Sequence, residues 1–346
     1  MNNLDSAEVV DSGHLLHAGF PDYRRQTVLV TGGAGFIGSH LVRGLLEKGA
    51  SVRVMDNLSS GTPGNLAEVR DRIEFHQADI TDPQACKKAA EGCRIVFHLA
   101  ARGSVPGSVA DPVGYNAVNV NGTLNVLEAC RQTGVHRLVY SASSSAYGDS
   151  ATLPKREDMP AAPKSPYAVG KLTGELYARV YAQVFNLSAV SLRYFNVFGP
   201  RQNPNSQYAA VIPAFIASVL RGESPRIFGD GGQTRDFCHV SNVVSANMLA
   251  GIATRPLAGE VVNIACGQNI SLNALLEKII GLLGRRVQPQ YLPPRQGDVR
   301  DSLADIAASG SLLGYRPVTY FDEGLAQTAA WYARQFKNSA DSPGQQ

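Results

Sequence analysis

The sequence has few cysteines, and they do not form a disulfide or metal-binding framework. The five cysteines among 346 residues are odd in number and scattered, without a CxxC pair or a cysteine and histidine cluster at metal-ligand spacing. These features argue against a disulfide-stapled secreted domain and against a metal site, and they favour a reducing, cytoplasmic setting. The cysteines are Cys86, Cys93, Cys130, Cys238 and Cys266.

Long apolar runs and long runs of one charge are also lacking. No apolar run reaches the roughly 20 residues that span a bilayer, and residues 1–26 lack the basic and then apolar pattern of a signal peptide. The 32 Lys and Arg residues exceed the 29 Asp and Glu residues by only three, and no basic block occurs. We therefore expect a soluble protein that binds neither a membrane nor nucleic acid.

The sequence does contain short β-branched runs that alternate with helical patterns. This alternation predicts βαβ units, and so a doubly wound, Rossmann-like α/β fold whose parallel sheet is covered on both faces. Gly134 is the expected stop of one helix, and Ser165 with Pro166 is the expected start of another. The expected strands are 28–30, 51–55, 73–76, 95–99, 138–141 and 188–194, and the expected helices are 38–48, 118–133, 167–185 and 211–221.

A glycine-rich turn follows the first expected strand. In the run Thr31–Gly38, Gly32 permits the turn, Gly35 lets backbone N–H groups approach a pyrophosphate, and Gly38 allows close packing of the helix on the strand. Asp56, after the second strand, can accept hydrogen bonds from the adenosine ribose and would repel a 2′-phosphate. The predicted cofactor is therefore NAD rather than NADP, and Asp79 is the expected contact of the adenine edge.

The composition changes after residue 194 and predicts a second, smaller α/β domain that is interleaved with the first. Residues 196–208 are rich in Asn, Pro, Gly and Gln, which is typical of a binding surface built from loops. The predicted organisation is a polar extension over 1–24, an NAD-binding domain over 25–195 and about 236–265, a substrate-binding domain over 196–235 and about 266–336, and a flexible tail over 337–346.

Tyr167 and Lys171 stand four residues apart in a helical pattern. Positions i and i+4 share a helix face, so the ammonium group can favour the phenolate. Lowering a phenol pKa from about 10 to about 7 takes roughly 4 kcal/mol, more than one lysine supplies, and a bound nicotinamide ring would add a second positive charge. The pair therefore predicts an enzyme whose proton acceptor is Tyr167.

A serine-rich loop completes the expected reacting centre. Residues 138–148 form a buried strand that runs out into Ser141, Ser143, Ser144 and Ser145. An open α/β sheet binds its ligands at this end of the strands. We expect at least one of these hydroxyls to bond a substrate oxygen.

Together these motifs resemble the extended short-chain dehydrogenase/reductase family, and most closely its nucleotide-sugar epimerase branch. The resemblance spans about residues 27–336. The motifs that carry it are TGGAGFIG at 31–38, HLAA at 98–101, the serine loop, YxxxK at 167–171, RYFNVFGP at 193–200 and RDF at 235–237.

The resemblance implies NAD as cofactor and a role for each matching residue. It implies Tyr167 as the acid and base, Lys171 as its pKa partner and a ligand of the nicotinamide ribose, and Ser143 as the hydroxyl that bonds O4 of the sugar. The implied NAD ligands are Gly32, Gly35, Phe36, Ile37, Asp56, Asn57, Ser59, Ser60, Gly61, Asp79, Ile80, Leu99, Ala101, Asn119, Ser141, Tyr167 and Lys171. The implied ligands of a UDP-sugar substrate are Gly103, Ser104, Ser143, Ser144, Ser145, Asn196, Gln202, Ala210, Val211, Arg235, Arg295, Asp298 and Ser302.

The same resemblance narrows the choice of reaction. Related dehydratases carry an Asp-Glu pair where this chain has Ser144 and Ser145, which disfavours a 4,6-dehydratase and also a decarboxylase with Glu in this loop. Ser302 matches a position that is a bulky aromatic in epimerases restricted to non-acetylated sugars. The chain is therefore predicted to be a UDP-N-acetylglucosamine 4-epimerase of the type that serves bacterial surface polysaccharide synthesis, with UDP-glucose as a possible second substrate.

Other functions stay open at this point. A UDP-glucuronate 4-epimerase or a UDP-glucose-restricted 4-epimerase is the main alternative, and a non-catalytic NAD-binding sensor is a remote one. The family also implies a homodimer that forms through the helices at 118–133 and 167–185.

Overall fold

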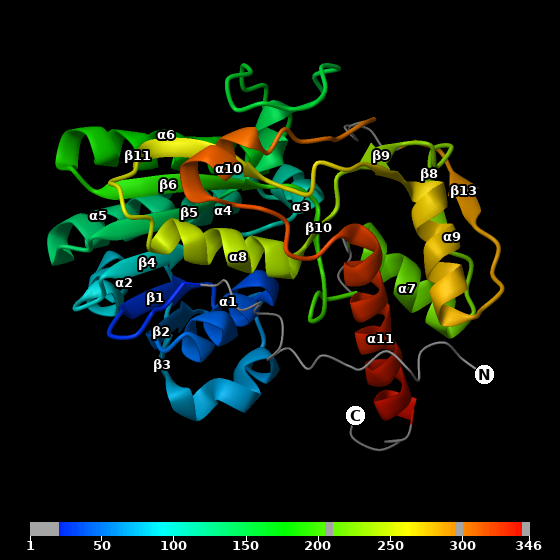
Figure 1. Cartoon of the computed structure of the whole chain (residues 1–346), viewed down its shortest axis with the longest axis horizontal. Coiled ribbons are helices and arrows are strands. Elements are labelled where there is room, and N and C mark those ends of the chain that lie inside the picture. Colours follow the sequence, from blue (N-terminus) through cyan, green and yellow to red (C-terminus); the bar gives the residue numbers. More distant parts are fainter. Residues whose placement is uncertain (1–20, 205–209, 295–299, 341–346) are drawn as a thin grey trace.

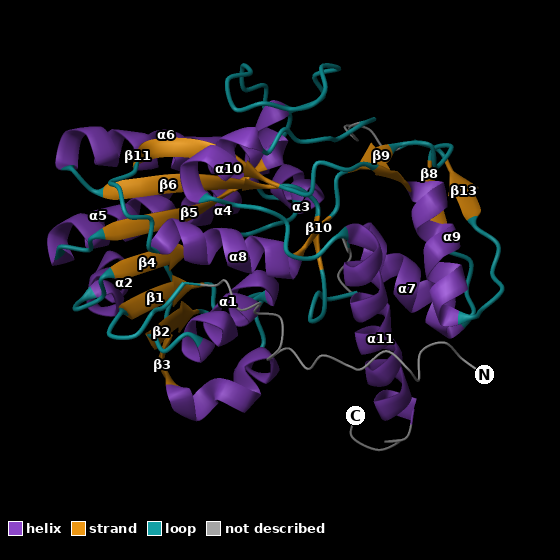
Figure 2. Ribbon diagram, viewed as in Figure 1, coloured by secondary structure: helices purple, strands orange, loops and turns teal. Residues whose placement is uncertain are grey.

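A seven-stranded parallel sheet forms the centre of the larger lobe (Figures 1 and 2). The computed structural model describes residues 21–204, 210–294 and 300–340. The strand order is β11-β6-β5-β4-β1-β2-β3, and neighbouring strands pair in parallel. The strands are β1 (Thr27–Thr31), β2 (Ser51–Asp56), β3 (Ile73–Gln77), β4 (Ile95–His98), β5 (Arg137–Ser143), β6 (Ser188–Tyr194) and β11 (Ala258–Ile264). The predicted Rossmann-like fold is confirmed.

Helices cover both faces of this sheet because its strands are apolar on both sides. Alternate residues of β1 illustrate this, since Val28 and Val30 pack with one set of helices and Leu29 with the other. The first set is α1 (Phe36–Glu47), α8 (Val240–Gly251) and α10 (Ala307–Leu313). The second set is α2 (Pro83–Ala90), α5 (Thr123–Thr133) and α6 (Pro166–Phe185).

The order in which the chain adds strands to the sheet changes sides between β1 and β4. From β1 it moves outward to β2 and β3, and then it returns to β4 and continues outward on the other side. The loops after β1 and β4 therefore diverge at the carboxyl ends of these two strands. Such a switch point leaves a crevice in which α/β proteins bind their ligands.

The smaller lobe is built from later segments and holds its own apolar core. Figure 1 shows α7 (Val211–Arg221), α9 (Leu272–Leu283) and α11 (Phe321–Ala340) together, beside short strand pairs. Phe198, Phe237 and Phe321 lie in this core, with ring centroids 5.7 to 6.2 Å apart. The short strands are β7 (Val197–Phe198), β8 (Arg226–Phe228), β9 (Thr234–Arg235), β10 (Cys238–His239), β12 (Ile270–Ser271) and β13 (Gln290–Leu292). Because α8 and β11 belong to the larger lobe, the two lobes are interleaved along the chain.

Local signals set several of the element ends as predicted. The Ser165 hydroxyl accepts a hydrogen bond from the Ala168 N–H at the start of α6, and Pro166 is its first residue. Gly134 ends α5 in the left-handed conformation, with φ of 71°.

Other features differ from the sequence-based expectation. The helix predicted over 118–133 begins as a π-helical segment, Ala117–Gly122, before α5. Tyr23 falls in the predicted extension, yet it is fully buried and donates a hydrogen bond to the Met248 carbonyl at 2.7 Å. Helix α11 runs to Ala340 and so includes the first residues of the predicted tail. The sequence patterns also missed α2, α10, α11, β11 and the 3₁₀ helix Pro63–Arg72. Within the described residues, no helix has both the length and the apolar character needed to cross a bilayer.

A buried arginine ties the sheet to the end of α8. Arg137, the first residue of β5, is 2% exposed. Its guanidinium donates to the carbonyls of Ala253 and Arg255 at 2.6 and 2.8 Å, with longer bonds to the last carbonyls of α8, and Nε donates to the Ser188 hydroxyl at 3.1 Å. A cation at a helix C-terminus satisfies carbonyls that have no partner within the helix.

Replacing this cation with an apolar side chain of similar length should destabilise the whole larger lobe. Arg137→Met leaves several buried carbonyls without a donor, so we expect a loss of roughly 3 kcal/mol in the free energy of unfolding. Denaturant unfolding followed by circular dichroism measures it. The matched control is Arg94→Met, because Arg94 is exposed, and it should change this free energy by less than about 0.5 kcal/mol.

Candidate functional site

The glycine-rich turn between β1 and α1 has a backbone that side chains would obstruct. Gly32 has φ of 70°, and a Cβ atom there would lie 2.7 Å from the Ala100 nitrogen. A Cβ atom at Gly38 would overlap the Gly32 carbonyl oxygen. Gly35 is the N-cap of α1, so the first N–H groups of this helix meet no capping side chain. The turn thus presents a helix N-terminus that suits a phosphate group.

Two carboxylates lie at the carboxyl ends of β2 and β3 beside this turn. The buried Asp56 accepts hydrogen bonds from the N–H groups of Ala34 and Leu58 at 2.9 and 2.8 Å, which fixes its position at the end of β2. Asp79 accepts from the Asn57 amide at 2.6 Å and from Thr81. Burial alone would raise the pKa of Asp79, but these hydrogen bonds outweigh it and lower the pKa. Both carboxylates therefore lie beside the turn, where each can accept hydrogen bonds from a ligand.

A cleft of about 840 Å³ runs along the switch point from these carboxylates to Tyr167 and Lys171. Its glycine turn at one side and its acceptor at the end of β2 fit a dinucleotide. Of the predicted cofactor residues, those that line the cleft are Gly32, Gly35, Phe36, Ile37, Asp56, Asn57, Ser59, Ser60, Asp79, Ile80, Leu99, Ala101, Ser141, Tyr167 and Lys171.

Two predicted cofactor residues lie behind the wall of the cleft. Gly61 packs against the Ala34 backbone, where a Cβ atom would lie 2.8 Å from the carbonyl carbon. The buried Asn119 side chain binds the backbone of Arg102 at both ends, accepting from its N–H at 2.8 Å and donating to its carbonyl at 3.0 Å. Asn119 therefore shapes the loop after β4, and a direct contact of either residue with the cofactor stays a prediction.

Tyr167 lies at the inner end of the cleft, in the first turn of α6. Burial raises the pKa of its phenol above the ordinary value, a hydrogen bond with Ser143 opposes this, and the nearby Tyr115 phenol adds to the rise. The protein alone therefore favours the neutral phenol. A bound nicotinamide cation would act in the opposite direction, as the sequence reasoning requires.

Lys171 is buried one helical turn further along α6. Its ammonium donates to the Ser141 carbonyl at 2.8 Å and lies 5.2 Å from the centroid of the Tyr140 ring. Burial lowers the pKa of Lys171 to about 8, against an opposite effect of the Glu175 carboxylate. The lysine is therefore still mainly charged at neutral pH.

The serine loop after β5 arranges its hydroxyls in a defined order. The Ser143 hydroxyl accepts hydrogen bonds from the Ser145 N–H at 3.2 Å and the Ser145 hydroxyl at 2.8 Å. The Ser141 hydroxyl bonds the Tyr194 hydroxyl at 2.9 Å. Of these serines, Ser141 lines the cleft, and Ser143 is hydrogen-bonded to Tyr167. Ser144 and Ser145 are partly exposed beside them.

A second cleft, of about 790 Å³, lies in the smaller lobe. Four predicted substrate residues line it: Asn196, Ala210, Val211 and Arg235. The Arg235 guanidinium donates to the carbonyls of Thr234 and Arg300 at 2.8 and 3.1 Å. Gly103 and Ser104 instead line the first cleft. The chain passes from the first cleft to the second between Tyr194 and Asn196.

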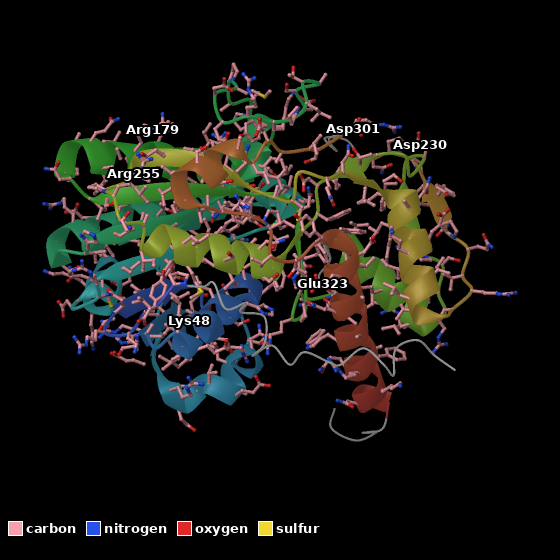
Figure 3. The ribbon with its side chains drawn as sticks, in the orientation of Figure 1. Lys48, Arg179, Asp230, Arg255, Asp301 and Glu323 are labelled. Carbon is pink, nitrogen blue, oxygen red and sulfur yellow. The ribbon has the colours of Figure 1, made fainter. Side chains whose placement is uncertain are left out.

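Two further predicted substrate residues, Gln202 and Ser302, line neither of these two clefts. Gln202 donates from its amide to the Val197 carbonyl at 3.2 Å. Ser302 is partly exposed, and its N–H donates to the Thr234 carbonyl at 3.1 Å. Its neighbours are anchored, because Asp301 accepts from the Thr234 hydroxyl and Arg300 pairs with Asp230; Figure 3 places both aspartates at the upper edge of the smaller lobe. Arg295 and Asp298 lie outside the described residues.

Sequence reasoning missed several residues that line the first cleft, among them Arg102, Tyr115 and Tyr194 with their polar side chains. The Arg102 guanidinium lies 4.2 Å from the centroid of the Tyr115 ring and pairs with Asp111 at 2.5 Å. Arg102 follows the HLAA run and Tyr194 belongs to RYFNVFGP, so these two motifs were available signals. No local pattern singles out Tyr115.

Comparison with known proteins agrees with this geometry. The model of the NAD dependent epimerase/dehydratase family matches residues 28–265, which is more than half of the chain. A UDP-glucose 4-epimerase of Mycolicibacterium smegmatis is 41% identical over 308 residues, covering 88% of this chain and 97% of the relative. A UDP-glucuronate 4-epimerase of Thermodesulfobacterium geofontis is 35% identical over 314 residues, covering 88% and 95%.

A solved structure is similar over nearly the same extent. It is the UDP-N-acetylglucosamine 4-epimerase from Methanobrevibacter ruminantium in complex with UDP-N-acetylmuramic acid. It is 40% identical, superimposes with a TM-score of 0.86, and the match covers 90% of this chain and 99% of that one. With this coverage and the glycine turn, Asp56, Tyr167 and Lys171 in place, the chain belongs to the NAD dependent epimerase/dehydratase family and is an enzyme with NAD as its cofactor.

Proposed function

We propose that the protein is an isomerase that inverts C4 of a UDP-hexose. The observation that carries the proposal is the group formed by Tyr167, Lys171 and Ser143, which sits at the inner end of the NAD cleft where the chain leads into the second cleft. Relatives that bear the name of UDP-sugar 4-epimerases and match almost the whole chain support it.

The protein's own residues handle the proton. NAD held in the cleft would supply the hydride chemistry at C4, as acceptor in the oxidation and as donor in the reduction. Ser143 holds O4 by a hydrogen bond, and Tyr167 takes the proton of the 4-hydroxyl as the bond to hydrogen at C4 breaks. Tyr167 gives the same proton back when the 4-keto sugar is reduced on its other face. Lys171 stabilises the phenolate between these two steps.

The substrate must be held firmly at one end and loosely at the other. The 4-keto sugar has to turn over, and a tight sugar pocket would oppose that rotation. A guanidinium group suits phosphate oxygens, so we assign Arg235 to the diphosphate, with Asn196 beside it in the second cleft. The nucleotide then anchors the substrate while the sugar moves.

The preferred sugar in this proposal is N-acetylated, which makes the substrates UDP-GlcNAc and UDP-GalNAc. The small side chain of Ser302 leaves room for an acetamido group, and its backbone is fixed by the bond to Thr234. Ser144 and Ser145 offer no carboxyl group for loss of water, which favours epimerisation over dehydration. The alternative substrates are UDP-glucose and UDP-glucuronate, because relatives named for those activities are 41% and 35% identical.

Removing the phenolic hydroxyl should separate binding from chemistry. For Tyr167→Phe we expect kcat to fall by about 10²–10⁴-fold, while the Kd for UDP in the NAD-loaded protein stays close to that of the wild type. Turnover is followed with each UDP-sugar, and binding by calorimetry. The control is Tyr177→Phe on the same helix, outside the described wall of the cleft, which should keep full activity. Turnover of Tyr167→Phe near the wild-type rate would rule out this mechanism.

Enlarging residue 302 should change the choice of sugar. Ser302→Tyr should lower kcat/KM for UDP-GlcNAc by about 10-fold or more relative to UDP-glucose, because the ring takes the space of the acetamido group. Ser302→Ala is the matched control and should leave the ratio unchanged. The assay includes UDP-glucuronate as a third substrate. An equal loss on all three would show that residue 302 does not select the sugar.

We also propose that two copies of the chain pair through α6. Apolar side chains at positions i, i+7, i+11 and i+15 of this helix are about half exposed, which is unusual for a stripe along one helix face. They are Val169, Leu176, Val180 and Val184, with exposures of 46 to 63%. A second copy would bury the stripe, as the family resemblance implies.

Charged groups in the stripe should break this dimer. The double variant Val180→Glu/Val184→Glu should sediment as a monomer at concentrations where the wild type sediments as a dimer, because pairing would bury its carboxylates. Tyr320→Glu is the control, since Tyr320 is 53% exposed outside α6, and it should not change the sedimentation coefficient. A monomeric wild type would refute the dimer and leave the catalytic proposal intact.

A further inference from the structure

The face of α6 that carries Tyr167 and Lys171 continues to a buried acid. Glu175 lies four residues beyond Lys171, so the three side chains are spaced i, i+4 and i+8 along one face of the helix. Glu175 is only 2% exposed, and the proposed chemistry does not use it. A carboxylate is rarely buried so deeply unless it is paired.

Arg193 of β6 forms a bidentate ion pair with Glu175. Its Nε and Nη2 donate to the two oxygens of Glu175 at 2.9 and 2.7 Å, and the arginine is itself 5% exposed. The guanidinium carbon lies 4.6 Å from the centroid of the Tyr147 ring, and Tyr147 is held by a bond from its hydroxyl to Asn263 at 2.7 Å. Both carboxylate oxygens are therefore fixed, which sets where the negative charge lies.

The other described groups near Lys171 carry no negative charge at neutral pH. From β5 it faces the Tyr140 ring and the Ser141 carbonyl. From β4 it meets His98, whose imidazole is neutral because burial, followed by the lysine charge, lowers its pKa to about 3. Tyr167 and Tyr194 line the same cleft from α6 and β6, and burial raises the pKa of both phenols. Arg193 adds a positive charge behind Glu175.

We propose that Glu175, held by Arg193, is a positioning residue that keeps Lys171 protonated while Tyr167 exchanges its proton with the substrate. Burial acts against the charge on Lys171, and Glu175 is the carboxylate that opposes this effect. A neutral Lys171 would no longer stabilise the phenolate. The inference rests on the proposed function for its catalytic consequence, whereas the charge on Lys171 is a property of the protein itself.

The first measurement is the pH profile of kcat in the NAD-loaded enzyme. Without the carboxylate, Lys171 loses its proton at a lower pH, so in Glu175→Gln the basic limb of the profile should move down by about 1 pH unit. Glu260→Gln on the edge strand β11 is the matched control, because Glu260 pairs with Arg255 at the surface, and its limb should stay in place. A basic limb of Glu175→Gln at the wild-type pH overturns the proposal.

A second variant keeps the proposal testable if Glu175→Gln does not fold. Glu175→Gln leaves Arg193 buried without its partner, which can destabilise the protein. The double variant Glu175→Gln/Arg193→Gln removes both charges, and its basic limb should also move to lower pH, because the attraction from the carboxylate is gone. Circular dichroism establishes that each variant is folded. A folded double variant with the wild-type limb overturns the proposal.

The second measurement does not depend on turnover. Lysine side chains labelled with ¹³C at Cε report protonation by NMR, and comparison with Lys171→Met identifies the Lys171 signal. Its titration midpoint should fall by about 1 pH unit in Glu175→Gln and stay unchanged in Glu260→Gln. An unchanged midpoint in Glu175→Gln refutes the role of Glu175. Lack of any UDP-sugar turnover by the wild type would instead refute the proposed function, and it would leave this titration as a valid test.

Discussion

The architecture of the site depends on a lysine ammonium that is buried without losing its charge. Lys171 reaches from α6 to the carbonyl of Ser141 near the end of β5, so one hydrogen bond of 2.8 Å joins the helix that carries Tyr167 to the strand that carries Ser143. Burying this charge is costly unless the protein supplies partners. The aromatic face of Tyr140 and the carboxylate of Glu175 are those partners, and they place the lysine where a phenolate benefits from it.

The strand order of the sheet places Lys171 and Tyr167 beside the dinucleotide cleft. Because β1 and β4 are neighbours while the chain runs outward from them in opposite directions, the loops after both strands leave a crevice between them. Gly32 at the end of β1 and Ala100 after β4 approach so closely that no side chain fits at Gly32. The backbone after both strands therefore lines the crevice.

Much of the fold and of the cofactor cleft could be predicted from the sequence. The glycine turn, Asp56 and the capping signals at Ser165 and Gly134 act within a few residues, so their effects can be read locally. Local signals are weaker for α2, β11 and α11, whose positions depend on packing rather than on periodicity. The sequence also predicts Asn119 as a cofactor ligand, and only the fold shows that both ends of its amide bind the backbone of Arg102.

By itself, then, the sequence determined the class of fold and the cofactor, and it singled out the pair that we propose to react, because helix spacing and turn geometry depend on neighbouring residues. The tertiary structure alone decided what surrounds that pair. Glu175 and Arg193 meet because α6 packs on β6, and Arg137 caps α8 because β5 starts beneath the end of that helix. Such contacts follow from the order of strands in the sheet and from which helix face is buried, which no local pattern of residues records.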